Sequence, residues 1–239
     1  MKTNTIFLLS FLIVALSCES SLTAEKIIKK SLEEAHGGTA NWEKLSHISY
    51  EKITTLYDSL GRAESDKIQF IKTTIQPEFS SEIRSFEGSI RKQITLKDDK
   101  VQLVVNDTPQ VENEALQSAR KDLMSAHFVL WQPYKLLTDD VQLTLEGTVF
   151  LEDQTEAYKI KAVYPNSDTI WWYYFDTTTF LLKENVVKHG TTYSQIKNIS
   201  QETKTGLRLH KERESYLIDS IKNQKYLRAH YQYDITELR

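Results

Sequence analysis

The chain has 239 residues and a formal net charge of −3, and no Lys/Arg cluster stands out along it, which argues against a nucleic-acid partner. Hydrophobic residues make up 40% and aromatic residues 10% of the sequence, values that are ordinary for a packed globular domain and exclude a disordered chain. The single cysteine excludes a disulfide within the chain.

The first seventeen residues predict a secretory signal peptide. Lys2 supplies the positive charge, and residues 6–16 form the apolar run of the signal peptide. The alternative interpretation is a membrane-spanning anchor, but the run is shorter than the roughly 20 residues that a spanning helix requires. The run ends in Ala15, Leu16, Ser17 and Cys18, which resembles the lipobox of bacterial lipoproteins. We therefore expect acyl chains on Cys18 to tether the domain to a membrane. By the same resemblance, the absence of Asp after Cys18 favours the outer membrane, with the domain facing the periplasm.

A helix is predicted to follow Thr23, which is a suitable N-cap, and to end at Gly37 and Gly38. Its apolar residues recur at helical spacing: Ile27, Ile28, Leu32 and Ala35. Trp42 is expected to pin the turn that the glycines make. His36 is interpreted as a helix-terminal residue favoured by the helix dipole, in preference to a catalytic residue.

From residue 48 onward, the spacing of apolar residues changes from the helical period to an imperfect period of two, which is typical of strands. Strands are predicted over residues 48–57, 67–74, 79–86, 90–96 and 101–105. Because the breaks between these strands are short, they must form an antiparallel meander.

Residues 111–130 interrupt the strands with a predicted helix. Its apolar residues follow i, i+3 and i+4 spacing: Leu116, Ala119, Leu123, Ala126 and Leu130. The apolar face widens near the end, which suggests that this end is surrounded or lies across an opening. Strands resume at residues 141–145, 158–164, 191–199, 207–218 and 226–235, giving about ten strands and about two main helices in all. Since the sequence has no repeat or linker, residues 18–239 are expected to form one domain.

An aromatic β-hairpin is the feature around which the domain is expected to be organised. The strands are residues 169–175 and 180–187, and residues 176–179 form the turn. If Phe175 pairs with Phe180, an almost wholly apolar face results: Trp171, Tyr173, Phe175, Phe180, Leu182 and Val186. The other face carries Ile170, Trp172, Tyr174, Leu181, Lys183 and Asn185.

An apolar cavity for an acyl chain is expected beside this face. The residues predicted to line it are Trp131, Tyr134, Trp171, Tyr173, Phe175, Phe180 and Leu182. The alternative is that these side chains form an ordinary core and leave no hole.

Three parts of the chain resemble the LolA/LolB-like family of outer-membrane lipoprotein-sorting proteins, especially its uncharacterised lipoprotein relatives. They are AHGGTANWEKLSHISY (35–50), FVLWQPYKLLTDDVQLTLEG (128–147), and WWYYFDTTTFLLKENV (171–186) with NISQETKTGLRLHKERESYLID (198–219). The resemblance implies a fold that is mainly β with helices (α+β): a strongly curved antiparallel half-barrel whose concave side is capped by helices and holds acyl chains. A tethered member is closest to a membrane-side acceptor, for which residues 128–137 are the candidate protruding apolar loop.

No motif for catalysis, a cofactor or a metal is found. The six histidines have no zinc-site spacing, and seven glycines leave little room for phosphate-binding loops. Asp139 and Asp140 are interpreted as capping residues rather than as a catalytic pair. The favoured function is therefore non-catalytic binding of a lipid or an acylated protein. The alternative is an envelope-stress sensor or other module that binds an envelope protein, and the third is an ester hydrolase that uses His210 or Asp140.

Overall fold

The computed structural model describes residues 22–239 apart from residues 139, 166 and 221–222. The predicted signal peptide, the lipid-attachment residue Cys18 and Asp139 lie outside the described residues. Among those that are described, no helix combines the length and the apolar character that crossing a bilayer requires.

One antiparallel sheet of thirteen strands dominates the structure, where about ten strands were expected. The strands are β1 (His47–Tyr57), β2 (Ala63–Thr74), β3 (Ser80–Glu87), β4 (Ile90–Lys97), β5 (Lys100–Val105), β6 (Thr108–Gln110), β7 (Gln142–Phe150), β8 (Glu156–Val163), β9 (Ile170–Asp176), β10 (Leu182–His189), β11 (Thr192–Glu202), β12 (Leu209–Ile218) and β13 (Gln224–Leu238). The predicted strand ranges agree with these to within a few residues. The three-residue strand β6 is too short to give a periodic signal.

The strand order shows how the two halves of the chain join. It runs β6-β5-β4-β3-β2-β1-β13-β12-β11-β10-β9-β8-β7, so each half is a meander and β1 pairs with β13 in the middle. The sheet is not closed, because β6 and β7 are its two edges. These edges are consecutive strands in the chain, and the segment that joins them carries two helices, α3 (Asn113–Leu130) and α4 (Lys135–Thr138).

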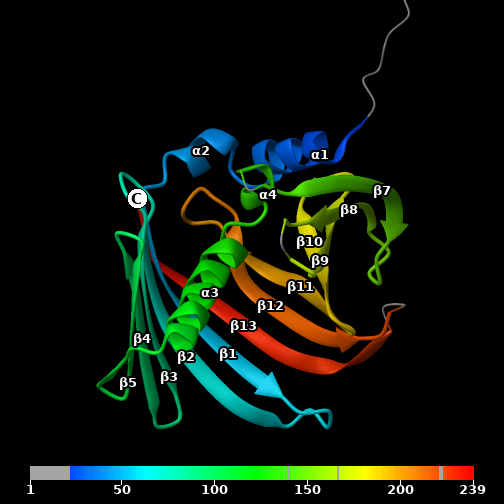
Figure 1. Ribbon diagram of the computed structural model, residues 1–239. Coiled ribbons are helices and arrows are strands. Elements are labelled where there is room, and N and C mark those ends of the chain that lie inside the picture. The colour runs from blue at the N-terminus through cyan, green and yellow to red at the C-terminus, as the bar shows by residue number, and fades with distance from the viewer. Residues whose placement is uncertain (1–21, 139, 166, 221–222) are drawn as a thin grey trace, which may run out of the picture.

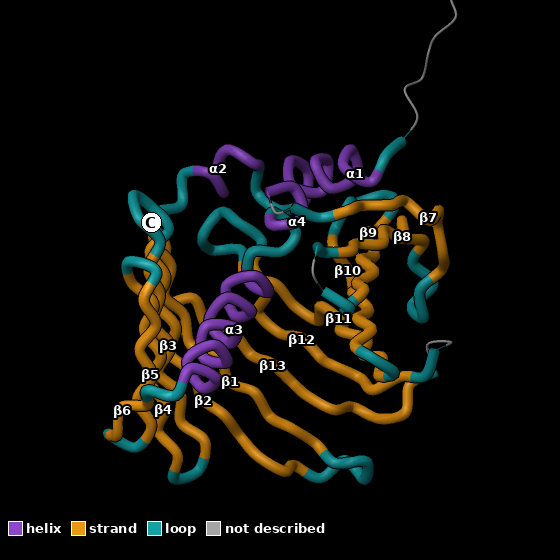
Figure 2. Tube along the Cα trace, in the orientation of Figure 1, coloured by secondary structure: helices purple, strands orange, loops and turns teal. Residues whose placement is uncertain are grey.

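The helices lie in two places. In Figures 1 and 2, α3 runs between the two arms of the curved sheet and in front of β1, β2 and β13, and it contacts β3, β4 and β5. The remaining helices gather at the top: α1 (Ala24–Lys30) with its π-helical extension η1 (Ser31–Ala35), α2 (Thr39–Glu43) and α4. Thr23 caps α1 as predicted, because its side chain accepts a hydrogen bond from the Lys26 amide at 3.3 Å.

The segment after α1 and η1 is anchored to two distant strands through His36. The imidazole Nε2 accepts a hydrogen bond from the Leu182 amide at 3.3 Å, so Nδ1 carries the proton and donates to the Arg208 carbonyl at 3.2 Å. Burial lowers the pKa of His36 to about 4. His36 does lie at the helix end, where it is the C-cap of η1. Its ring is buried and neutral, so the part of the interpretation that invokes the helix dipole is wrong.

The glycines behave as predicted. Gly37 and Gly38 have φ of 91° and 87°, and a Cβ on Gly37 would lie 2.4 Å from the Gly206 carbonyl oxygen. Trp42 pins this turn by donating from Nε1 to the His36 carbonyl at 2.8 Å.

The aromatic hairpin is present, but the predicted register is wrong. Phe175 pairs with Leu182 rather than with Phe180, and a bulge follows between Leu182 and Glu184. Phe180 has a positive φ of 56° and belongs to the turn, where Asp176 accepts hydrogen bonds from the amides of Thr178 and Thr179.

The shifted register changes which side chains share a face. Tyr173 pairs with Asn185, so Asn185 lies on the face of Trp171, Tyr173 and Phe175, and its side chain is fully buried. There it accepts a hydrogen bond from Arg213 at 2.6 Å. Val186 lies on the opposite face, in a second small core cluster: Leu151, Ala157, Tyr174, Val186 and Ile218.

Residues 128–137 do not protrude. Leu130, Trp131 and Leu136 are at most 4% exposed, and every side chain from 128 to 137 is buried or half-buried. Trp42 of α2 contacts both Trp131 and Tyr134, so the end of α3 is surrounded, as the widening apolar face suggests. The expectation of an exposed apolar loop, which the family resemblance implied, is wrong.

A candidate ligand-binding cavity under helix α3

Two rows of side chains cross β1 to β4 on the face that looks toward α3. In the first row the register partners are buried and apolar or aromatic: Tyr50, Ile71, Ile83 and Ile94. In the next row, two residues further along each strand, the partners are polar: Lys52, Gln69, Ser85 and Lys92. Because residues two apart in a strand point to the same face, this face of the sheet changes from a buried apolar row to a polar row between neighbouring inward-facing residues.

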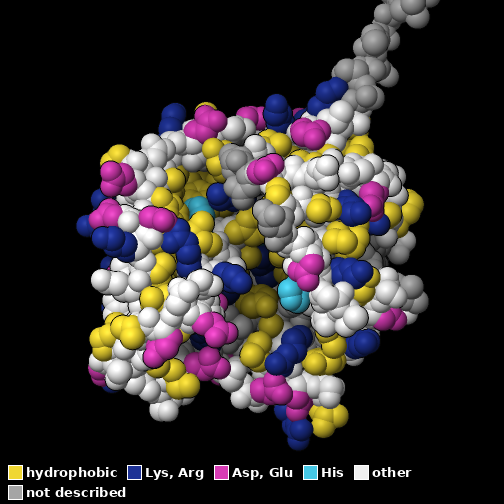
Figure 3. Space-filling model, viewed as in Figure 1, with side chains coloured by type: hydrophobic (Ala, Val, Ile, Leu, Met, Phe, Trp, Pro, Cys, Tyr) yellow, Lys and Arg dark blue, Asp and Glu magenta, His cyan; other side chains and the backbone are white. Residues whose placement is uncertain are grey.

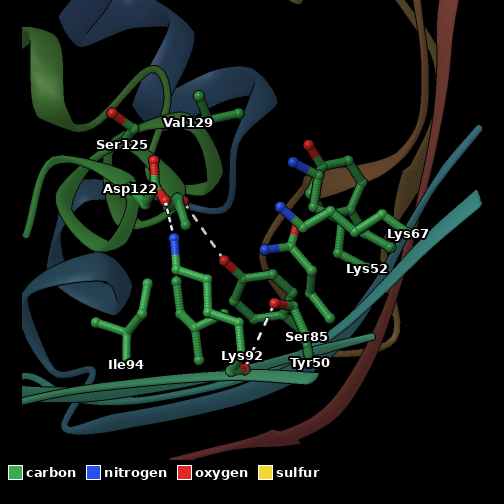
Figure 4. Close-up of a pocket in the computed structure, with 13 residues that line it drawn as sticks. Tyr50, Lys52, Lys67, Ser85, Lys92, Ile94, Asp122, Ser125 and Val129 are labelled. Atoms are coloured by element: carbon green, nitrogen blue, oxygen red, sulfur yellow. Dashed lines mark hydrogen bonds and ion pairs between the residues drawn. The ribbon is translucent and has the colours of Figure 1, made fainter. Parts of the chain in front are cut away.

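Helix α3 presents four side chains to the two rows at i, i+3, i+4 and i+7 spacing: Asp122, Ser125, Ala126 and Val129. Together with Lys67 and Tyr233, helix and sheet line a partly open cavity of about 220 Å³ (Figure 4). This volume lies below the roughly 300–1,000 Å³ of pockets that enclose drug-sized ligands. Figure 3 shows the same side of the molecule hollowed between its two halves, with hydrophobic side chains and Lys or Arg side chains together in the hollow.

Two polar contacts between lining residues join α3 to the sheet. The Tyr50 hydroxyl donates to the Ala126 carbonyl at 3.4 Å, and Lys92 pairs with Asp122 at 2.8 Å. Burial raises the pKa of Tyr50, so this hydroxyl stays protonated and remains a donor. The ion pair is partly exposed, which limits its contribution to stability to about 1 kcal/mol or less.

The cavity wall is basic. Lys52 and Lys67 reach from the sheet toward the cavity, opposite Asp122 and Ser125 (Figure 4). The ammonium of Lys52 lies 5.0 Å from the ring centroid of Tyr231 and 5.7 Å from that of Tyr233. With three lysines and one aspartate in its lining, the cavity carries a formal charge of +2.

All seven residues predicted to line a pocket meet in one hydrophobic cluster. Trp131, Tyr173, Phe175, Phe180 and Leu182 are buried there, and Tyr134 and Trp171 pack against them half-buried. Trp171 stacks on Tyr173 with ring centroids 5.9 Å apart, and the Tyr173 hydroxyl accepts from Gln132 at 3.2 Å. The cluster is the main core of the domain and also contains Tyr50, Ile83 and Ile94. Within it, Phe180 lies under the Lys30 ammonium of α1, and Trp171 contacts Phe128 near the end of α3.

Two residues of this set border a pocket near α2. Trp131 and Tyr134 line a small pocket of about 130 Å³ with Trp42, Leu45 and Ile75. Trp42 stacks on Tyr134, with ring centroids 5.7 Å apart and the rings inclined by 6°. The other five predicted residues line neither this pocket nor the cavity under α3.

The residues that line the cavity under α3 are not among those predicted from the sequence. Their signal is an alternation in which the inward residues of one strand pass from apolar to polar, as in Ile71, Gln69 and Lys67 of β2. In a single strand, this change from apolar to polar residues looks like the end of the buried part of the strand. Only the register of β1 to β4 shows that all four strands change from apolar to polar at the same level of the sheet.

The buried histidines His127 and His210 are uncharged at neutral pH. Burial lowers the pKa of His127 to about 3, with a smaller effect from Lys135, and burial with nearby Arg213 holds the pKa of His210 well below its usual value. Within the described ranges, no group of three or more His, Cys, Asp or Glu side chains is placed to hold a metal ion.

Comparison with solved structures identifies the fold. A LolA superfamily protein from Nitrosomonas europaea superposes with a TM-score of 0.53, covering 92% of this chain and 94% of that one at 10% sequence identity. The chain has a LolA-like fold. No protein-family model and no curated protein matches the sequence.

Two further structures align more weakly with the LolA-like sheet. A putative outer membrane lipoprotein-sorting protein domain from Vibrio parahaemolyticus gives a TM-score of 0.42 at 6% identity, over 82% of this chain and 84% of that one. MucB, in its complex with MucA(peri), gives 0.22 at 13% identity, over 80% of this chain and 50% of that one.

Proposed function

We propose that the protein is a non-catalytic lipid- or lipoprotein-binding protein of the bacterial envelope, and that an acyl chain enters the space between α3 and the sheet. The observation that carries this proposal is the cavity itself: an open LolA-like sheet whose inner face is left partly uncovered beneath a helix. Its apolar part, formed by Ile83, Ile94, Ala126 and Val129, is the surface that would cover the chain. Each methylene buried there would contribute about 0.8 kcal/mol before ordering costs.

A long acyl chain needs more room than about 220 Å³. In this proposal α3 acts as a movable cap on the concave side of the sheet. Among the described residues, its polar contacts with the sheet and its turns come from Tyr50, Lys92 and the partly exposed ion pair of Arg120 with Asp99. When α3 shifts, the seven residues predicted to line a pocket become the far wall of a longer apolar groove. Trp171 of this set contacts Phe128 of α3 edge to face, with ring centroids 5.9 Å apart.

The tether belongs to the same proposal. Removal of residues 1–17 and acylation of Cys18 would place the domain at the outer membrane, facing the periplasm, where acylated molecules are presented. A fixed domain of this kind suits an acceptor better than a freely shuttling carrier.

A cavity-filling variant tests the binding site. Ala126→Phe places a ring in the cavity, so we expect it to abolish binding of a fluorescent fatty acid by delipidated protein. Gln117→Phe adds the same ring at an exposed position on the far side of α3, nine residues away, and should leave binding unchanged. Equal binding by the two variants, or no binding of any amphiphile by the unmodified protein, would contradict the proposal.

Protein interaction is the second candidate function, and an exposed patch favours it. On the outer face of β2 and β3, Ile68, Phe70 and Phe86 are 37–41% exposed, and the two phenylalanine rings meet edge to face at 6.1 Å. Crosslinking in the envelope separates the two functions. A single stoichiometric protein partner that is retained by Ala126→Phe and lost in Phe70→Ser with Phe86→Ser would support interaction as the main role.

A further inference from the structure

The charge of the cavity lining points to the chemistry of its ligand. Lys52, Lys67 and Lys92 line the cavity together with one acid, Asp122, and that acid is already paired with Lys92 at 2.8 Å. Two ammonium groups therefore remain without a carboxylate partner in the described part of the chain. Neither is fully solvated, since both side chains are half-buried.

The surroundings of each lysine show why no acid neutralises it. Lys52 is held over the rings of Tyr231 and Tyr233, whose faces attract a cation but leave its charge uncompensated. The register partners of Lys67 are Thr54 on β1 and Glu87 on β3. Glu87 is exposed and makes no ion pair with Lys67 within the described structure. The positive charge is thus directed into the cavity.

We propose that Lys52 and Lys67 form a subsite for the anionic head of an amphiphile, a carboxylate or a phosphate, whose chain lies on the apolar row of the same cavity. This inference rests on the proposed function and specifies its ligand class. The sheet places the two requirements side by side: Tyr50 and Ile71 belong to the apolar row, while Lys52 and Gln69 lie two residues further along the same strands. A neutral head would leave the two ammonium groups unpaired, whereas an anionic one would accept charge-assisted hydrogen bonds from them.

Three ligands that share one chain length test the subsite: decanoate, decyl phosphate and decanol, titrated calorimetrically into the full-length protein. We expect both anions, or one of them, to bind at least about tenfold more tightly than decanol. A preference for decanoate would assign a carboxylate head, and a preference for decyl phosphate a phosphate head. Equal affinity of all three ligands would overturn the inference while leaving the proposed function intact.

Lysine substitutions locate the effect. Lys52→Met and Lys67→Met keep an unbranched apolar stem and remove the charge, so each should weaken binding of the preferred anion about tenfold and leave decanol binding within about twofold. Lys72→Met removes an exposed charge from the other face of β2 and is the matched control. If Lys72→Met had the same effect as Lys67→Met, long-range attraction rather than a subsite would explain the preference, and the inference would fail.

A measurement on the unaltered protein covers the case in which a variant does not fold. Raising the salt concentration should weaken binding of the anions and leave that of decanol unchanged. Salt-independent binding of all three ligands would contradict a charged subsite, whereas failure of all three to bind at any salt concentration would contradict the proposed function itself.

Discussion

His36 and Leu182, 146 residues apart in the sequence, are joined by a hydrogen bond of 3.3 Å from the Leu182 amide to the imidazole Nε2. The other ring nitrogen of His36 contacts the Arg208 carbonyl, so one buried side chain connects the segment after η1 to the first residue of β10 and to the residue before β12. A neutral imidazole satisfies both partners at once, since it has one donor and one acceptor.

Replacing this histidine should destabilise the fold strongly. His36→Ala leaves the buried Leu182 amide and the Arg208 carbonyl without their partner and opens a hole, so we expect the free energy of unfolding to fall by about 2–4 kcal/mol in denaturant titrations. His189→Ala, at an exposed site where the ring is hydrogen-bonded to Thr169, should cost less than about 0.5 kcal/mol. Similar losses in the two variants would show that His36 is not an anchor.

Stability should fall as the pH is lowered from about 6.5 toward about 4. Because burial lowers the folded-state pKa of His36 to about 4, the unfolded chain binds the additional proton throughout this range and is favoured by acid. The contribution of His36 is complete above its unfolded pKa, and about 2 kcal/mol of it should be lost between pH 7 and pH 5. Unfolding free energies measured at the two pH values should differ by less in His36→Gln, and an equal difference in both proteins would contradict this assignment.

The turn at Gly37 should not accept a side chain. Gly37→Ala combines a φ of 91° with a Cβ 2.4 Å from the Gly206 carbonyl oxygen, so we expect a loss of more than about 3 kcal/mol, read from the midpoint of thermal unfolding. Gly190→Ala has a φ of 57° with open space around the new Cβ and should lose only about 1 kcal/mol. Both variants strain the backbone, so the difference between their losses of stability gives the cost of the close contact with the Gly206 carbonyl oxygen.

Removing the acid from the cavity should strengthen binding of an anionic amphiphile. Asp122→Asn frees Lys92 and raises the formal charge of the lining from +2 to +3, so we expect decanoate to bind a few times more tightly, with stability changed by less than about 1 kcal/mol. Asp107→Asn breaks the exposed ion pair with Arg91 and is the control for net charge. An equal increase in decanoate affinity in both variants would show that the net charge of the protein, and not the charge of the cavity lining, is responsible.

Strand positions could be predicted from the sequence because alternation is a local property. The hairpin of β9 and β10 was recognised, yet its register was not, because a positive φ at Phe180 and a bulge after Leu182 depend on how the turn packs against α1 and β8. The ring of Phe180 stacks on Tyr158 and lies under the Lys30 ammonium. These contacts keep it in the turn and move the first strand pair to Phe175 and Leu182.

The cavity could not be located for a related reason. The seven aromatic and aliphatic residues chosen from the sequence do come together, since a strongly apolar set is buried wherever the chain allows. The position of the cavity depends on two features that no single segment shows. One is the level at which β1 to β4 change from apolar to polar residues, and the other is the side of α3 that faces the sheet. Lys52 and Lys67 look like ordinary strand residues until β1 and β2 are aligned.

The edges β6 and β7 are joined by covalent chain and not by a ladder of backbone hydrogen bonds. A sealed barrel must rupture such a ladder to widen, whereas here the distance between the edges is set by how the segment from α3 to α4 packs. If α3 moves as proposed, the interior changes its volume while every strand keeps its neighbours, and ligands of different width fit the same sheet.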